Sequence, residues 1–270
     1  MTTAATWLVA LLGQPVGHSG SPAIHTAAFA AAGVDAAYLA FEVAPERLAT
    51  AVSGLRALGA LGANVTVPHK TAALALADAA TEEAQLVGAA NTLFWRTGST
   101  GEAVLTADNT DAAGLERELR DDLGLVAGDT VVLFGSGGAA RAAAVALGRV
   151  GARVEVSARR AEAAGEIAEL AARAGAVPDE VGEPRCVINA TPLGLAGESL
   201  PARFMTLGDG QIALDLVYGV SETPFLRAGA AGGATVRDGT GMLIEQAALA
   251  FERWIGSAPP RSAMRAALAT

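Results

Sequence analysis

A lysine stands directly after a segment that is typical of a buried β-strand. In NVTVPHK, residues 64–70, Val65, Thr66 and Val67 are β-branched, Pro68 ends the strand pattern, and Lys70 follows. Such a lysine can be an ordinary cation at the end of a loop or a group that exchanges a proton with a ligand. This segment alone does not decide between the two, so polar residues elsewhere in the chain are needed as evidence.

Further polar side chains follow predicted strands, where α/β sheets bind their ligands. Ser19 and Ser21 flank a turn before an expected helix, and two hydroxyls beside a helix start suit a small anion such as a carboxylate. The other side chains suit a polyhydroxylated small molecule. They are Asn64, Thr66, Lys70, Asn91, Thr92, Asn109, Thr110, Asp111, Tyr218 and Gln246.

The two serines also raise the possibility of a hydrolase. Residues 17–21 read GHSGS, close to the G-x-S-x-G nucleophile elbow of α/β-hydrolases. However, Ser21 replaces the second glycine. A hydrolase of this class also needs its acid and then its histidine after the serine, and no histidine follows His69. The sequence therefore disfavours a hydrolase.

A glycine-rich loop lies between an expected strand at 130–134 and an expected helix at 139–150. It carries the pattern Gly135-x-Gly137-x-x-Ala140. The first glycine permits a tight turn, the second lets a pyrophosphate approach the backbone, and the small third residue lets helix and strand pack closely. The helix N-terminus adds free N–H groups. We therefore predict a dinucleotide-binding loop made of Gly135, Ser136, Gly137, Gly138, Ala139 and Ala140.

The end of the next strand indicates which dinucleotide is bound. At this point NAD-binding proteins carry an acidic residue that accepts hydrogen bonds from the ribose. Here Ser157 and Ala158 are followed by Arg159 and Arg160. Guanidinium groups suit a 2′-phosphate, so the sequence predicts NADP(H). The alternative is that both arginines are solvated residues at a helix start.

Short apolar runs alternate with alanine-rich helical stretches along the chain. This rhythm predicts α/β units with parallel sheets covered by helices. In the first half we expect strands at 7–12, 37–42 and 63–67 and helices at 22–32 and 45–58, with Ser21 as an N-cap. In the second half we expect strands at 130–134, 153–157, 186–189 and 212–216 and helices at 114–123, 139–150, 161–175 and 242–255.

Two α/β domains follow from this rhythm. We expect a substrate-binding catalytic domain at 1–109, with residues 242–270 packing back on it, and a Rossmann-type NADP-binding domain at 110–241. The 270 residues are enough for two such cores.

Composition excludes several other classes. A net charge of −9 disfavours nucleic acid and acidic membranes as partners. Cys186 is the sole cysteine, and His18, His25 and His69 show no zinc spacing, so we expect neither a disulfide nor a metal. The apolar run 7–12 has no basic region before it and is too short for a signal or a membrane span, which predicts a cytoplasmic protein.

Taken in order, these segments resemble the shikimate dehydrogenase family over nearly the whole chain. They are HSGSP, NVTVPHK, GAANT, DNTDAAG, GSGGAARA, NATPLG, DLVYGVSETPFL and GTGMLIEQA. The resemblance implies that Lys70 and Asp111 are the catalytic pair and that Ser19 and Ser21 hold the substrate carboxylate. It implies contacts to the ring hydroxyls from Asn64, Thr66, Asn91, Asp111, Tyr218 and Gln246. It also implies NADP contacts from residues 135–140, Arg159, Arg160, Asn189, Ala190, Thr191 and Gly239.

The chain departs from the family pattern at three places. Thr26 replaces the asparagine after SPxIH, Ala158-Arg159-Arg160 replaces Asn-Arg-Thr, and a proline often found after the substrate tyrosine is missing. The second change keeps an arginine for the 2′-phosphate but drops the asparagine. NADP is therefore expected, whereas strictness against NAD is left open.

The resemblance implies reversible reduction of 3-dehydroshikimate to shikimate by hydride transfer from NADPH in a cleft between the two domains, a step of the chorismate pathway in aromatic amino-acid biosynthesis. Lys70 would exchange the proton, with Asp111 as its orienting partner. Quinate or aminoshikimate dehydrogenases are alternatives, because a few pocket contacts separate these substrates. A catalytically idle regulator is more distant, since the Lys70–Asp111 pair is intact. The expected partner is the small substrate, with a homodimer as a possibility.

Overall fold

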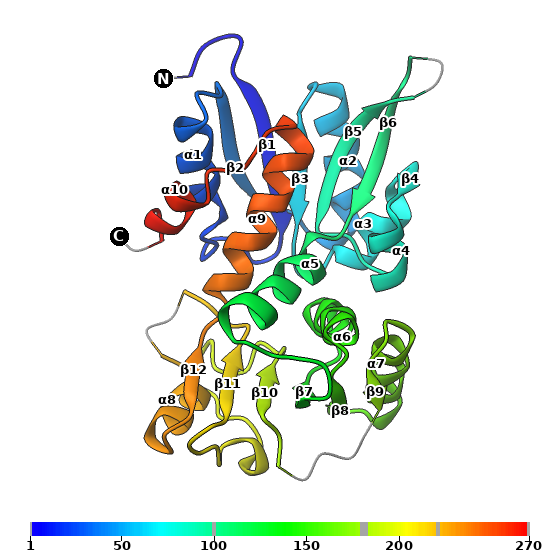
Figure 1. Cartoon of the computed structure of the whole chain (residues 1–270). Helices are drawn as coiled ribbons and strands as arrows, with labels where there is room; N and C mark the ends of the chain where they lie inside the picture. Colours follow the sequence, from blue (N-terminus) through cyan, green and yellow to red (C-terminus); the bar gives the residue numbers. More distant parts are fainter. Residues whose placement is uncertain (1, 99–100, 179–182, 220–221, 269–270) are drawn as a thin grey trace. The chain divides into compact units, whose positions relative to one another are not determined.

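The chain forms two compact units, each built around one six-stranded sheet (Figure 1). The computed structural model describes residues 2–98, 101–178, 183–219 and 222–268. Unit 1 contains Met1–Thr110 and Ile244–Thr270, and unit 2 contains Asp111–Leu243. Both divisions fall inside helices, α5 (Thr110–Arg117) and α9 (Thr240–Ile255), close to the predicted boundaries after residues 109 and 241.

The sheet of unit 1 has the strand order β2-β1-β3-β5-β6-β4. Its strands are β1 (Trp7–Gly13), β2 (Ala36–Glu42), β3 (Gly62–Val65), β4 (Ala79–Ala80), β5 (Thr92–Thr97) and β6 (Ala103–Asp108). The predicted parallel pairing is right for β1, β2 and β3, but β5 runs antiparallel to both β3 and β6. Only residues 98–102 separate β5 from β6, too few for the crossover that parallel neighbours need.

Helices cover both faces of this sheet. They are α1 (Ser21–Ala31), α2 (Leu48–Ala57) after a short 3₁₀ turn at Pro45–Arg47, α3 (Lys70–Leu76), α4 (Glu82–Val87), α9 and α10 (Arg261–Ala266). Figure 1 shows α1 and α9 on one face and α2 on the other. Because successive strand residues point to opposite faces, Ala10 and Leu12 of β1 share a core with Leu48 and Val52 of α2.

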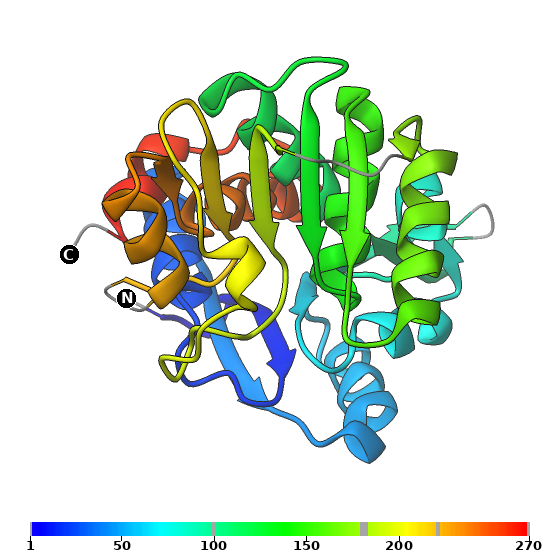
Figure 2. The same cartoon turned by 90° about the horizontal axis from the view of Figure 1, so that it is seen from below.

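The sheet of unit 2 is parallel throughout. Its strands are β7 (Thr130–Phe134), β8 (Arg153–Ser157), β9 (Val177–Pro178), β10 (Cys186–Asn189), β11 (Ile212–Asp215) and β12 (Thr235–Arg237). The order β9-β8-β7-β10-β11-β12 reverses between β7 and β10, as in a Rossmann fold. Helices α6 (Gly138–Val150) and α7 (Ala161–Arg173) lie side by side (Figure 2), and α8 (Pro224–Ala231) packs on β11 and β12. The predicted α/β class with two α/β units is confirmed.

Three local predictions were wrong. Gly20, and not Ser21, is the N-cap of α1, so Ser21 begins the helix. Strand β3 ends at Val65 because the chain turns there, with the His69 N–H donating to the Thr66 carbonyl at 2.9 Å. The helix expected at 114–123 begins at Thr110 and continues as a turn of π-helix at Glu118–Asp122, which places Asp111 in the first turn of α5.

Candidate functional site

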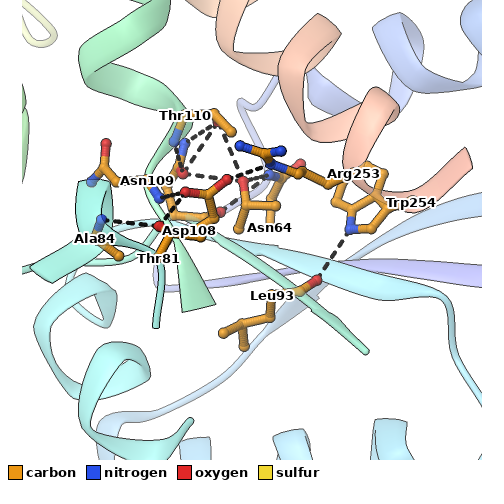
Figure 3. Close-up of polar contacts among 11 residues, drawn as sticks. Asn64, Thr81, Ala84, Leu93, Asp108, Asn109, Thr110, Arg253 and Trp254 are labelled. Atoms are coloured by element: carbon orange, nitrogen blue, oxygen red, sulfur yellow. Dashed lines mark hydrogen bonds and ion pairs between the residues drawn. The ribbon is translucent and has the colours of Figure 1, made fainter. Parts of the chain in front are cut away.

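The strand register of unit 1 places polar residues from three strands in one row. Asn64 of β3 lies opposite Thr92 of β5, and Thr92 lies opposite Asp108 of β6. Because β5 is antiparallel, its first residue falls at the edge where β3 and β6 end. The predicted Asn64 and Thr92 therefore meet Asp108, which was not predicted, at one edge of this sheet. Figure 3 shows Asn64 and Asp108 at this edge.

Asn64 is held by hydrogen bonds on both sides of its amide. It is only 5% exposed. Its Nδ2 donates to the Asn91 carbonyl at 3.1 Å and to Thr92 Oγ1 at 3.2 Å, and its Oδ1 accepts from the Tyr38 hydroxyl at 2.8 Å. Tyr38 was not predicted as a site residue.

Asn91 connects a strand end to two helices. Its Nδ2 donates to Thr110 Oγ1 at 2.9 Å and to Gln246 Oε1 at 3.2 Å, and its Oδ1 accepts the Thr110 backbone N–H at 2.8 Å. The buried Asn91 thus supplies an N-terminal acceptor to α5 from a distant segment and contacts α9. The structure brings the predicted Asn64, Asn91 and Gln246 into one network.

Lys70 is the first residue of α3, next to the same network. Its carbonyl accepts the Ala90 N–H at 2.8 Å, which joins α3 to the loop that carries Asn91. The preceding His69 is buried, with Nε2 lying 2.7 Å from the Val43 carbonyl oxygen. Thr66 is half-buried, and its N–H donates to the Leu12 carbonyl at 2.9 Å.

The two predicted serines follow β1, the neighbour of β3. Ser21 is buried at the start of α1, and its backbone N–H donates to Ser19 Oγ at 3.2 Å. The serines are thus close to each other at the edge of the sheet where β1 and β3 end, as a shared carboxylate site requires.

An ion pair between a buried carboxylate and a half-exposed arginine joins α9 to the sheet. Asp108 is 1% exposed and accepts from Arg253 Nε at 2.6 Å and from Thr81 Oγ1 at 2.6 Å (Figure 3). One residue later, the Trp254 indole N–H donates to the Leu93 carbonyl at 3.1 Å, and a Cβ at Gly62 would collide with this indole. These contacts orient the helix that carries Gln246. Sequence reasoning missed them because residues far apart in the chain make each of them.

Two residues that the sequence predicts to serve substrate binding and catalysis belong to unit 2. Asp111 is buried in the first turn of α5, and Tyr218 is half-buried after β11. Val220 and Ser221 of the segment DLVYGVSETPFL lie outside the described residues. The pairing of Lys70 with Asp111 stays a prediction.

The glycine loop of unit 2 has the shape that a pyrophosphate needs. Gly135 has φ +142°, and a Cβ there would lie 2.8 Å from the Ala190 carbonyl oxygen. Gly137 is the N-cap of α6, and a Cβ there would meet no atom within 4 Å, so the space beside it is open. Ala140 is fully buried, and the first turn of α6 carries no acidic residue. The loop therefore fits NADP phosphates at a helix N-terminus.

The segment NATPLG is shaped by the Asn189 side chain. This fully buried amide donates to the Leu193 carbonyl at 3.0 Å and to Asp215 Oδ1 at 2.8 Å, and it accepts from Thr191 Oγ1 at 2.7 Å. Burial raises the pKa of Asp215, whose other oxygen accepts from Thr223. Asn189 thus orders the loop through its side chain. Of the two following residues predicted to contact NADP, Ala190 is buried and Thr191 is half-buried.

Arg159 and Arg160 lie exposed between β8 and α7. Neither side chain makes a hydrogen bond or an ion pair with any other residue that the structure describes, so both guanidinium groups are available to a phosphate. Arg203, which was not predicted, donates to Ser157 Oγ at 2.6 Å nearby. Gly239 packs against the Leu216 carbonyl, where a Cβ would collide.

No helix within the described ranges is long and apolar enough to cross a membrane. Those same ranges contain no group of three or more His, Cys, Asp or Glu side chains that could hold a metal ion.

Comparisons with known proteins agree with this arrangement. Residues 11–93 match the shikimate dehydrogenase substrate binding domain, and residues 239–269 match the shikimate 5′-dehydrogenase C-terminal domain. The shikimate dehydrogenase (NADP(+)) of Citrifermentans bemidjiense is 41% identical over 99% of this chain and 96% of its own.

Two solved structures are similar over the full length. Shikimate dehydrogenase from Aquifex aeolicus has a TM-score of 0.90 at 32% identity and covers 100% of both chains. The shikimate 5-dehydrogenase of Thermus thermophilus, solved with NADP(H) and shikimate, has a TM-score of 0.84 at 35% identity and covers 98% of this chain and 99% of its own. With its polar strand-end network, its glycine loop and these relatives, the chain belongs to the shikimate dehydrogenase family.

Proposed function

We propose that the protein is an NADP-dependent shikimate dehydrogenase, an oxidoreductase that interconverts 3-dehydroshikimate and shikimate. Its family, its open glycine loop and its strand-end network support this activity. The reaction moves a hydride and a proton, so it needs a bound nicotinamide and a side chain that can both give and take a proton.

The observation that carries the proposal is the identity of residue 70. Of the 19 lysine and arginine residues, Lys70 is the only lysine. Guanidinium groups stay protonated in proteins, whereas an ammonium group can exchange its proton. A chain that uses arginine at every other basic position thus retains one lysine, next to the polar network of unit 1. Proton transfer is a role that arginine cannot fill.

In the proposed reaction, Ser19 and Ser21 hold the substrate carboxylate, and the network around Asn64 and Asn91 contacts the ring hydroxyls. Thr66, Tyr218 and Gln246 complete these contacts. When bound, NADPH supplies the hydride. Lys70 gives a proton to the reacting oxygen during reduction and removes it during oxidation, with Asp111 orienting the ammonium group.

The cofactor is held by the backbone N–H groups at the start of α6 and by the guanidinium groups after β8. Residues 135–140 contact the pyrophosphate, and Arg159 and Arg160 bind the 2′-phosphate. The remaining cofactor surface is lined by Ala190, Thr191 and Gly239. The cleft between the domains, the cytoplasmic location and the homodimer stay predictions from the sequence.

The variants Lys70→Ala and Lys70→Arg test the role of the lysine. Loss of a positioned acid–base group lowers the rate by about 10²- to 10⁴-fold. We expect kcat for shikimate oxidation to fall by this factor in both variants while KM changes by less than about fivefold. Arg56→Ala, which removes an exposed cation paired with Asp78, is the matched control and should retain full activity. Near-normal turnover of Lys70→Arg would contradict the assignment of proton transfer to residue 70.

A further inference from the structure

Tyr38 is a buried residue of β2 that no sequence pattern singled out. It is 3% exposed, and its hydroxyl lies 2.8 Å from Asn64 Oδ1. Asn64 is predicted to contact the substrate, so a residue that hydrogen-bonds its amide can control what this amide offers to a ligand.

The surrounding hydrogen bonds fix the orientation of the Asn64 amide. The Asn91 backbone carbonyl can only accept, so the Asn64 atom that faces it must be Nδ2. The second Nδ2 hydrogen points to Thr92 Oγ1. Oδ1 therefore faces Tyr38, whose hydroxyl must be the donor. Both amide hydrogens are used within the protein, and one lone pair of Oδ1 is left for a ligand.

His25 provides a competing partner for the same amide. Its ring stacks on the Tyr38 ring at 4.5 Å and 13°, and it is fully buried. Neither ring nitrogen has a hydrogen-bond partner among the residues that the structure describes. Burial lowers the pKa of His25 to about 3, and the nearby Asn64 side chain acts in the opposite direction. The imidazole is thus neutral, unpartnered and close to Asn64, although no regular hydrogen bond joins them.

We infer that Tyr38 is a positioning residue for substrate binding: its hydroxyl holds Asn64 away from His25 and leaves Asn64 able only to accept. The substrate group that meets Asn64 must then be a hydrogen-bond donor. A hydroxyl meets this requirement, whereas an ether or a fluorine at the same ring position does not. This inference rests on the proposed function, because it requires that Asn64 contacts shikimate.

The test is a cycle of Tyr38→Phe, Asn64→Ala and the double variant, each assayed with shikimate and NADP. Without the hydroxyl, the Asn64 amide is free to turn toward His25 and away from the ligand. We expect Tyr38→Phe to raise KM for shikimate about tenfold and to change kcat by less than about twofold, because binding is lost equally from ground and transition states. In the Asn64→Ala background, Tyr38→Phe should raise KM no further.

Phe29→Leu is the matched control. It also changes a buried aromatic side chain beside His25, with ring centroids 6.1 Å apart, but the Phe29 side chain has no group that can hydrogen-bond Asn64. Its KM should equal that of the unmodified protein. This comparison separates positioning from a general loss of packing, which would affect both variants alike.

Each result decides the inference. An unchanged KM in Tyr38→Phe, an equal rise in both backgrounds, or a rise matched by Phe29→Leu overturns the inference and leaves the proposed activity standing. An unchanged KM in Asn64→Ala overturns it together with the substrate role of Asn64. If the unmodified protein does not oxidise shikimate at all, the proposed function itself is contradicted.

Discussion

Individual polar side chains differ in how many of their hydrogen-bond donors and acceptors are already bonded to other groups of the protein. The amides of Asn91 and Asn189 are bonded within the protein through both nitrogen and oxygen. The guanidinium groups of Arg159 and Arg160 show no bond to another residue within the described parts of the chain. The first pair is suited to ordering its surroundings, and the second pair is suited to binding an anion.

Replacement of Arg159 by glutamine tests the cofactor assignment at this scale. Loss of one charge-assisted hydrogen bond to the 2′-phosphate should weaken NADPH binding by about 10- to 100-fold, while NADH, which lacks that phosphate, should bind as before. Fluorescence titration of both cofactors measures this difference. Arg173→Gln, in the last turn of α7, is the control and should change neither affinity. An equal effect on both cofactors would place the 2′-phosphate elsewhere, with Arg160 and Arg203 as the next candidates.

At the scale of elements, two glycines of one loop should respond differently to alanine. Gly135→Ala places a Cβ 2.8 Å from the Ala190 carbonyl oxygen at φ +142°, so we expect a loss of about 1–3 kcal/mol of unfolding free energy. Gly137→Ala meets no protein atom within 4 Å, so its stability should match the unmodified protein while its affinity for NADP falls. Urea unfolding and cofactor titration measure the two effects. Unchanged NADP affinity in Gly137→Ala would contradict the pyrophosphate assignment.

The junction of the π-helical turn with α9 should make stability depend on pH. Glu118 is 2% exposed, accepts a hydrogen bond from the Met242 N–H, and leaves no room for a Cβ at Gly241. Burial, together with Asp122 and Asp238, raises the pKa of Glu118 from 4.5 to about 7, against the opposing effects of the Met242 N–H and of Arg237.

The sign of this pH dependence follows from the raised pKa. Between pH 4.5 and about 7 the folded protein keeps a proton that the unfolded chain has released, so this contribution to stability is complete below 4.5 and lost as the pH rises through 7. Glu118→Gln keeps the acceptor without the charge. In urea unfolding, the free energy of unfolding of Glu118→Gln minus that of the unmodified protein should rise by up to about 3 kcal/mol between about pH 5 and about pH 8. A stability difference that does not change with pH would contradict this account of Glu118.

Across the whole molecule, the sequence predicted best the parts that depend on local pattern. Strands β7, β8 and β10 have the expected bounds because buried parallel strands appear as continuous apolar runs next to turn signals. The antiparallel β5 was not anticipated, and the start of α5 was misplaced because its acceptor, the Asn91 side chain, comes from a distant segment.

The same distinction separates the site residues that were predicted from those that were not. Motif residues such as Lys70, Asn64 and Gly135 could be named from the sequence, and unit 1 gathers several of them at one edge of its sheet. Tyr38, Asp108 and Asp215 could not be named, because their importance lies in bonds to residues distant in the chain. Local sequence carries the groups that do chemistry, and the tertiary structure supplies the groups that hold them.

The most direct test of the central claim is a spectrophotometric assay of the unmodified protein with shikimate, quinate and aminoshikimate, each with NADP and with NAD. We expect the highest kcat/KM for shikimate with NADP. A higher kcat/KM for quinate or aminoshikimate, or for NAD, would contradict the assigned specificity. Failure to reduce either cofactor with any of the three substrates would contradict the assignment as a dehydrogenase of this class.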